Sequence, residues 1–256
     1  MKKIAFMTGG GDCAGINSFI ASAVRHGSQK YGAEFVGIKK AFEGAAADNI
    51  EEHLLPLGLP EVLGLEVKPS TILASSRFNP FSPENKEKGY PEKITANLKR
   101  LGIDGVLATG GNDTIKSAMG LAELGFPVIA APKSIDNDVS GTDTMLGFKT
   151  AVAFGSQAFR STVESARTHR RISLVEIMGR DAGWLSLEIG IAGGADLILI
   201  PEKPVDLKKL CERIGEVFAR QSYVNIAVAE GVRLRNDDPV LESVKKQSPV
   251  VAAMVE

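Results

Sequence analysis

The sequence predicts an α/β fold built from parallel sheets, and three observations support this expectation. Short apolar runs recur along the chain without polar alternation, as expected for strands that are buried on both faces. Each run ends in a cluster of glycine, proline or polar residues, and most clusters precede apolar residues at helical spacing. Strands that alternate with helices in this way form parallel sheets with right-handed crossovers.

The first half of the chain contains three predicted strands. They are KIAFMT at 3–8, DGVLAT at 104–109 and FPVIAA at 126–131. Apolar residues at helical spacing follow the first strand from Ile16 and the second from Ile115. Residues 42–92 contain many prolines and weak periodicity, so they predict no clear element.

The second half repeats the pattern after a long predicted helix at 148–169. Its predicted strands are RISLVEIM at 171–178, ADLILI at 195–200 and NIAVA at 225–229, with helices expected at 184–192 and 207–218. We place the domain boundary at the start of the long helix. The sequence therefore predicts two α/β domains, at 1–147 and 148–256.

Composition argues against several classes of protein. With 30 Lys+Arg, 31 Asp+Glu and a net charge of −1, the chain has no basic footprint for nucleic acid or for a membrane surface. No run approaches the ~18 apolar residues of a membrane span, and the short run at 4–7 indicates a core strand rather than a targeting segment. The two cysteines fit neither a disulfide framework nor a metal motif. We therefore expect a cytoplasmic protein that binds neither nucleic acid nor membranes.

Two glycine loops follow predicted strands and open predicted helices, GGG at 9–11 and GG at 110–111. Glycine lets backbone N–H groups approach an anion, and the helix N-terminus adds partial positive charge. The first loop has neither the P-loop nor the Rossmann spacing, and a simple tight turn is an equally good interpretation of it. Asp113 after the second loop fits an N-cap, or a carboxylate that reaches a phosphate through Mg²⁺. Together the two loops indicate a magnesium-bound polyphosphate.

The segment PKSIDNDVSGTDT at 132–144 gathers three aspartates, whose like charges cost stability unless something offsets them. Ordinary turn chemistry is the simpler explanation. However, ligands of open parallel sheets bind beyond the carboxyl ends of the strands, and the polar clusters of this chain all lie at such ends. Phosphoryl transfer needs a base, magnesium and cations. Asp136 or Asp138 fits the base or a metal helper, and Lys133 fits the cation.

Four arginines are candidate phosphate clamps. They are Arg77, Arg170, Arg171 and Arg180. Taken singly, each fits a solvated surface position better. Cys13, in the first glycine loop, fits a packed and inert small residue better than a thiol of lowered pKa.

Six segments together resemble the 6-phosphofructokinase family, in order, over nearly all of residues 1–231. They are TGGGDCAGIN (8–17), SSRF (75–78), GGNDT (110–114), PKSIDNDVSGTDTMLGF (132–148), HRRISLVEIMGRDAGWLSLEIGIAGGADLILIPE (169–202) and VAEG (228–231). The resemblance implies two Rossmann-like parallel-sheet domains with the active site in the cleft between them. The first would bind the phosphoryl donor, and the second, incomplete in this chain, the sugar phosphate.

The resemblance also implies roles for individual residues. Asp136 matches the base that takes the proton from the 1-hydroxyl of fructose 6-phosphate, and Asp138 matches its partner acid. Gly11 and Arg77 match groups that hold the transferring phosphoryl. The implied donor-binding residues are Gly10, Gly11, Asp113, Thr114 and Lys133. The implied substrate-binding residues are Ser134, Asp136, Arg171, Met178, Gly179, Arg180 and Glu230. The implied ligands of Mg²⁺ are Asn112 and Asp113.

The phosphoryl donor is expected to be pyrophosphate. The ATP-dependent branch of the family has glycine at the positions of Asp113 and Lys133, and this chain resembles the pyrophosphate-dependent branch at both. A carboxylate at 113 would repel the α-phosphate of a nucleotide, and a lysine at 133 would add charge against a compact anion. An ATP-dependent 6-phosphofructokinase is the alternative.

Three departures from the family pattern bear on function. Asn112 replaces an aspartate that commonly binds magnesium, and Ala21 replaces an effector-site arginine of allosteric bacterial members. The sequence ends at VVAAMVE, before a segment that supplies further sugar-phosphate cations. Either the chain is truncated or its substrate site differs, so a non-catalytic family member is a further alternative. Another alternative is a related kinase class that shares a Gly-Gly-Asp-Gly-like loop. Because the residue matched by Arg171 reaches across a subunit interface in the family, we expect a homodimer or homotetramer.

Overall fold

The computed structural model describes residues 2–234, and within them the chain divides into two compact units. The first unit extends to Ile135 and also includes Val139–Gly147. The second unit starts at Phe148 and also includes the short segment Asp136–Asp138. The boundary between Gly147 and Phe148 coincides with the start of the long helix. The assignment of residues 136–138 to the second unit was not predicted from the sequence.

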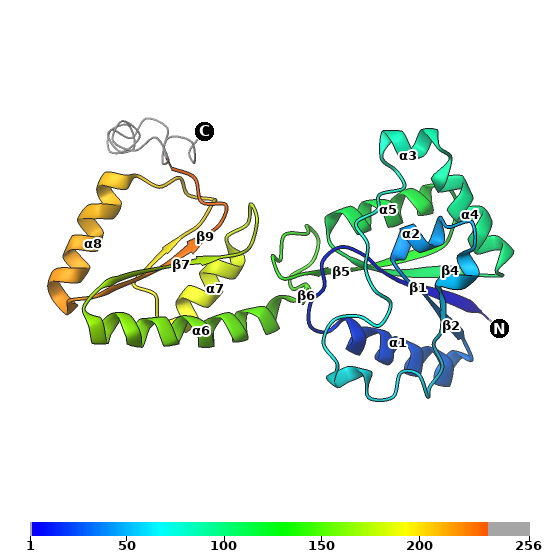
Figure 1. The fold of residues 1–256 in the computed structure, drawn as a ribbon, viewed down its shortest axis with the longest axis horizontal. Helices are drawn as coiled ribbons and strands as arrows, with labels where there is room; N and C mark the ends of the chain where they lie inside the picture. The colour runs from blue at the N-terminus through cyan, green and yellow to red at the C-terminus, as the bar shows by residue number, and fades with distance from the viewer. Residues whose placement is uncertain (1, 235–256) are drawn as a thin grey trace. The chain divides into compact units, whose positions relative to one another are not determined.

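The described part of the first unit contains a six-stranded sheet (Figure 1). Its strands are β1 (Lys3–Thr8), β2 (Glu34–Ile38), β3 (Leu54–Pro56), β4 (Gly105–Gly110), β5 (Val128–Ser134) and β6 (Leu146–Gly147), in the order β3-β2-β1-β4-β5-β6. Every pairing is parallel except that of β3 with β2. The carboxyl ends of β1, β4 and β5 therefore share one edge of the sheet, and both glycine loops leave the sheet there.

Helices cover both faces of this sheet (Figure 1). The helical elements are α1 (Ile16–Tyr31), α2 (Ala41–Ala45), η1 (Ile50–His53), η2 (Leu65–Val67), α3 (Pro83–Glu87), α4 (Tyr90–Arg100) and α5 (Asn112–Glu123). Ala5 and Met7 of β1 pack in one core with residues of α2, α4 and α5, whereas Phe6 packs in a second core with α1. Because β1 is buried on both faces, its sequence shows no alternation of apolar and polar residues.

The second unit contains a three-stranded parallel sheet within the described residues. Its strands are β7 (Ile172–Ile177), β8 (Leu197–Leu199) and β9 (Val224–Ala229), in the order β7-β9-β8, and its helices are α6 (Phe148–His169), α7 (Trp184–Gly193) and α8 (Leu207–Gln221). Val217 of α8 packs with Val224 and Ile226 on one face of β9. On the other face, a Cβ at Gly190 of α7 would lie 3.2 Å from the Cβ of Ala227, so helix and strand approach closely there. The predicted α/β fold class is confirmed for both units.

No helix among the described residues is long and apolar enough to cross a membrane.

Candidate active site

The first glycine loop leaves the carboxyl end of β1 in a conformation that requires glycine. The Gly9 amide donates to the carbonyl of Thr109 at 3.0 Å, and the Gly10 amide donates to the carbonyl of Ser76 at 3.0 Å. Gly10 has a φ of 78°, in the left-handed region that side chains rarely adopt. These bonds tie the loop to the end of β4 and to the segment that contains Ser76.

Thr114 fills the space between the two glycine loops. It is buried in the first turn of α5, and a Cβ at Gly9 would lie 2.5 Å from its Oγ1. A Cβ at Gly110 would also collide with the Thr114 side chain. Both loops therefore need glycine for close packing against Thr114, whatever they bind.

The second glycine loop leads directly into α5. The N-cap residue is Gly111, which offers no side-chain cap, and Asn112 and Asp113 are the first two helical residues. Asp113 is exposed and lies two positions past the N-cap. Its carboxylate instead lies in the first turn, where negative charge interacts favourably with the helix dipole. An N-cap role therefore does not explain why position 113 is an aspartate.

Lys133 brings a buried positive charge to the first glycine loop. Its side chain, near the carboxyl end of β5, is 4% exposed, and its Nζ donates to the carbonyl oxygen of Gly11. The same Nζ lies 3.8 Å from the position that a Cβ would take at Gly10. Burial of an ammonium group is costly unless polar groups surround it. The ammonium group and the loop therefore form one polar cluster at the sheet edge.

Cys13 lies in the same loop, but its thiol is packed rather than activated. The Sγ donates to the carbonyl of Leu146 at 3.4 Å. Burial raises the pKa of the Cys13 thiol to about 11, although the nearby charge of Lys133 opposes the shift. The thiol is protonated near neutral pH, so the interpretation as an inert packed residue holds.

Arg77 lies in a segment that is bound to the first glycine loop. The Ser75 hydroxyl donates to the Gly10 carbonyl, and the Ser76 carbonyl accepts from the Gly10 amide at 3.0 Å. The Arg77 side chain is exposed and forms no ion pair within residues 2–234. Sequence reasoning missed Glu43, which accepts from the Ser76 hydroxyl at 2.6 Å. The sequence shows only that residue 43 is acidic, and it lies within residues 42–92, where no clear periodicity predicts an element.

The aspartate-rich segment follows β5 directly. Ser134 ends the strand, and Asp136 and Asp138 are both half-buried, whereas Asp143 is exposed. Asn137 between them has a φ of 55°, a left-handed conformation that asparagine tolerates better than most residues. The two half-buried carboxylates therefore flank a sharp change of chain direction rather than a helix or strand.

In the second unit, Glu230 organises the turn that follows β7. Its Oε1 accepts from the amide of Gly179 at 2.9 Å and from the amide of Arg180 at 2.6 Å. Arg180 has a φ of 53°, and both Arg180 and Met178 are exposed. The structure therefore brings these four residues together at the carboxyl end of β7, and it gives Glu230 a backbone-binding role that the sequence did not indicate.

Arg171 does not belong to this group within one chain. It precedes β7 and donates to the Ser165 hydroxyl at 2.7 Å, whereas Met178 follows the same strand. A strand rises about 3.3 Å per residue, so the seven steps from Arg171 to Met178 separate the two by roughly 23 Å. Arg171 and Arg180 therefore lie at opposite ends of β7.

Comparison with known proteins identifies the family. The sequence matches the family described as Phosphofructokinase over residues 3–254. The chain belongs to the phosphofructokinase family.

Its curated phosphofructokinase relatives include enzymes of both donor types. The pyrophosphate–fructose 6-phosphate 1-phosphotransferase of Streptomyces coelicolor is 41% identical over 94% of this chain and 68% of its own length. The corresponding protein of Dictyoglomus thermophilum is 42% identical over 91% of this chain and 65% of its own length. ATP-dependent 6-phosphofructokinase 2 of Clostridium perfringens is 38% identical over 97% of this chain and 69% of its own length. Overall sequence identity therefore does not show whether the phosphoryl donor is pyrophosphate or ATP.

Solved phosphofructokinase structures share the fold. The Saccharomyces cerevisiae phosphofructokinase has a TM-score of 0.79 at 29% identity, over 98% of this chain and 37% of that chain. The pyrophosphate-dependent phosphofructokinase of Nitrosospira multiformis has a TM-score of 0.79 at 21% identity, over 97% of this chain and 67% of that chain. This chain thus spans about two thirds of the bacterial relatives and a smaller share of the yeast protein.

The first turn of α5 offers ligands that suit a magnesium ion in a phosphofructokinase. Within residues 2–234 no three His, Cys, Asp or Glu side chains cluster as a metal site. Mg²⁺ nevertheless prefers hard oxygen ligands, and it is commonly bound by one or two carboxylates together with substrate phosphates and water. Asp113 supplies a carboxylate and Asn112 a side-chain carbonyl, so this donor set fits Mg²⁺ that arrives with a polyphosphate.

Proposed function

We propose that the chain transfers a phosphoryl group from pyrophosphate to the 1-hydroxyl of fructose 6-phosphate. The observation that carries the proposal is the position of Lys133, whose ammonium group is buried against the first glycine loop. The loop backbone and the ammonium together suit a small, densely charged anion. Pyrophosphate is such an anion, and it needs no space for a nucleoside.

Asp113 supports the same choice of donor. Its exposed carboxylate follows the second glycine loop without serving as the N-cap. It would repel the α-phosphate of a nucleotide, and refusal of the wrong ligand is an ordinary part of specificity. ATP-dependent phosphotransfer is the second candidate, because ATP-dependent relatives match this chain at 38% identity.

In this proposal the first predicted domain, residues 1–147, binds the donor, and the second, residues 148–256, binds the sugar phosphate. Asp136 takes the proton from the 1-hydroxyl, with Asp138 as its partner acid. Arg77 and the amide of Gly11 hold the transferring phosphoryl group, and Gly10, Thr114 and Lys133 complete the donor site. Mg²⁺ would be held by Asn112 and Asp113, where it would neutralise charge on the donor oxygens.

The sugar phosphate would be held by groups of the second unit together with Ser134. These groups are Arg171, Met178, Gly179, Arg180 and Glu230. Because Arg171 and Arg180 lie at opposite ends of β7, one sugar phosphate contacts both only if Arg171 comes from another copy of the chain. We therefore propose a cytoplasmic homodimer or homotetramer, and sedimentation that detects only monomer at micromolar concentration would contradict it.

The donor is tested by steady-state kinetics of the wild type with fructose 6-phosphate and Mg²⁺. We expect kcat/KM to be higher with pyrophosphate than with ATP. A preference for ATP would overturn the donor assignment and leave the second candidate. No turnover with either donor would favour a non-catalytic family member.

A further inference from the structure

Glu43 connects α2 to the segment that contains Ser76, a contact that no sequence pattern predicts. Its Oε2 accepts from the Ser76 hydroxyl at 2.6 Å, and its Oε1 accepts from Nζ of Lys40 at 3.1 Å. The hydroxyl has a single proton, which it donates to Glu43, so its oxygen is left to accept from the Phe78 amide at 3.0 Å. One carboxylate therefore orients a hydroxyl that in turn holds the backbone just after Arg77.

The other side of the same segment is bound to the first glycine loop. The Ser76 carbonyl accepts from the Gly10 amide, and the Ser75 hydroxyl donates to the Gly10 carbonyl. The segment Ser75–Phe78 has no helix or strand of its own. Bonds to Gly10 on one side and to Glu43 on the other help to hold it in place, together with the packing of Phe78 against Tyr90.

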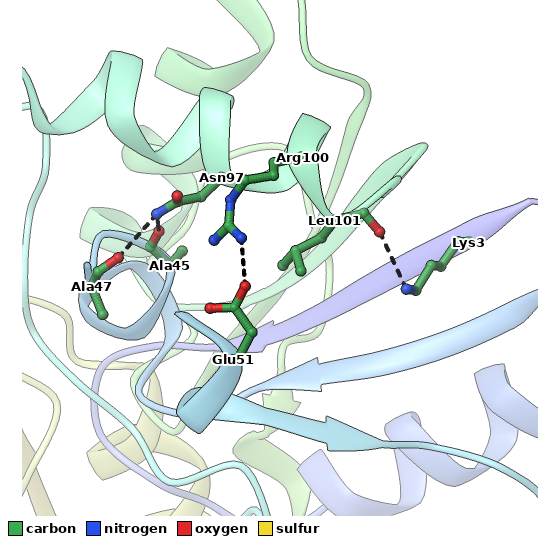
Figure 2. A network of polar contacts seen from close by, with 7 residues as sticks. All are labelled: Lys3, Ala45, Ala47, Glu51, Asn97, Arg100 and Leu101. Atoms are coloured by element: carbon green, nitrogen blue, oxygen red, sulfur yellow. Dashed lines mark hydrogen bonds and ion pairs between the residues drawn. The ribbon is translucent and has the colours of Figure 1, made fainter. Parts of the chain in front are cut away.

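Glu43 is itself carried by a firmly anchored helix. Figure 2 shows that Asn97 of α4 donates to the carbonyls of Ala45 and Ala47, at the end of α2, both at 3.0 Å. At the start of the helix, the Lys40 amide donates to the carbonyl of Leu73 at 2.9 Å. Because both ends of α2 are bound, the exposed side chain of Glu43 is carried on a fixed stretch of backbone.

The charge on Glu43 suits this role. The Ser76 hydroxyl, and then Lys40, hold the pKa of the Glu43 carboxyl below its usual range, with His53 as a further nearby charge. An ionised carboxylate accepts hydrogen bonds and donates none. The direction of the Glu43–Ser76–Phe78 chain of bonds is therefore fixed near neutral pH.

We propose that Glu43 is a positioning residue: it holds the segment Ser75–Phe78 against the first glycine loop and thereby fixes the place of Arg77 beside the phosphoryl donor. This proposal rests on the proposed function, since it assumes that a donor binds at the glycine loop. Glu43 touches neither the donor nor the reacting atoms, and it acts through Ser76.

The test compares Glu43→Ala, Glu43→Gln, Ser76→Ala and the Glu43→Ala/Ser76→Ala double variant. Glu51→Ala is the matched control, because Glu51 also pairs with a single cation, Arg100, in the same unit but has no bond to the segment (Figure 2). We would measure the Kd of pyrophosphate by calorimetry, the KM values of pyrophosphate and fructose 6-phosphate, and the melting temperature. Amide hydrogen exchange at Gly10 and Phe78, resolved by NMR, would report on the segment directly.

We expect Glu43→Ala to weaken pyrophosphate binding by about threefold to tenfold, as for the loss of one orienting hydrogen bond. The KM of fructose 6-phosphate should stay unchanged, and amide exchange at Gly10 and Phe78 should accelerate. Glu43→Gln, which keeps an acceptor oxygen, should restore most of the binding. If Glu43 acts through Ser76, the double variant should bind no more weakly than Ser76→Ala alone.

Three results would overturn the proposal. They are unchanged pyrophosphate affinity in Glu43→Ala, an equal loss in Glu51→Ala, and additive losses in the double variant. If the wild type binds neither pyrophosphate nor ATP, the proposed function is wrong, whatever role Glu43 has. In that case, faster exchange at Gly10 and Phe78 in Glu43→Ala still supports the positioning role, and unchanged exchange refutes it.

Discussion

Replacement of Lys133 by glycine removes the cation that lies against the first glycine loop. The lysine side chain is 4% exposed, and its ammonium group donates to the Gly11 carbonyl. A hydrogen bond to a charged group contributes about 1.5–3 kcal/mol. If Lys133 makes one such bond to the transferring anion, its loss should lower kcat/KM for pyrophosphate by roughly 10- to 150-fold.

The same substitution should not create an ATP-dependent enzyme by itself, because the Asp113 carboxylate remains. Asp113→Gly should allow measurable use of ATP, and the double variant Lys133→Gly/Asp113→Gly should use ATP best. Lys133→Met separates charge from shape, since it removes the ammonium group but fills much of the buried space. We expect it to lose pyrophosphate activity about as strongly as Lys133→Gly does.

The assay is kcat/KM for pyrophosphate and for ATP, with fructose 6-phosphate as acceptor, in the wild type and the four variants. Lys116→Ala serves as control, because Lys116 is exposed on α5 and absent from the proposed site. Melting temperatures identify any variant whose loss of activity follows from unfolding, since about 1 kcal/mol shifts a domain of this size by roughly 2–4 °C. A wild type that prefers ATP, or a double variant with no gain in ATP use, would refute the reasoning.

Three further predictions concern the base, the glycine loop and the thiol. Asp136→Asn should keep the melting temperature but lose roughly 10²–10⁴-fold in kcat; near-normal turnover would remove Asp136 from the mechanism. Gly9→Ala should destabilise the fold by about 1–3 kcal/mol because its Cβ would lie 2.5 Å from a buried side chain. A Cβ at Gly11 would meet nothing within 4 Å, so Gly11→Ala should leave the free energy of unfolding in urea almost unchanged while weakening donor binding. Equal destabilisation by Gly9→Ala and Gly11→Ala would contradict the packing argument. Because the pKa of Cys13 is raised to about 11, its labelling by a thiol reagent should stay slow at pH 8 and accelerate only as the pH rises toward that value. The exposed Cys211 should react at once. Equal labelling rates of the two cysteines at pH 8 would show that the Cys13 thiol is not protected.

The central strands of both sheets were predictable from sequence because they are buried on both faces. β1, β4 and β9 lie within one residue of their predicted ranges, since continuous apolar runs bounded by glycine or polar clusters leave little choice of register. The long helix α6 has the predicted bounds of 148–169.

The region between β2 and α4 resisted prediction for a physical reason. Its elements are short, and α2 is preceded by Lys40 with a φ of 61° and begins with Ala41 at 49°, values that neither residue type signals. The bonds that fix this region join residues far apart in the chain, such as Asn97 to Ala45. No local pattern reports such contacts, which is why Glu43 was not among the expected site residues.

The candidate site residues divide in the same way. Glycine loops and their strand ends are visible in sequence, because the backbone conformation demands a particular residue type. The role of Glu230 toward the amides of Gly179 and Arg180 is not visible, because any acidic residue in a loop fits many partners. Sequence therefore indicates which loops matter better than it indicates what holds them in place.

Thr114 has a consequence for how such a site changes over evolution. Its side chain occupies the space that a Cβ at Gly9 or at Gly110 would need. The three positions are therefore coupled in evolution. A larger residue at Gly9 becomes tolerable only after Thr114 is replaced by a smaller residue, and one at Gly110 only after position 114 has lost its Cβ as well, which lies 2.4 Å from the Cβ position at Gly110. A smaller residue at 114 would in turn leave the two loops free to drift apart. Relatives that alter one of these positions are expected to have altered another, so the spacing between the loops changes in paired steps rather than by single substitutions.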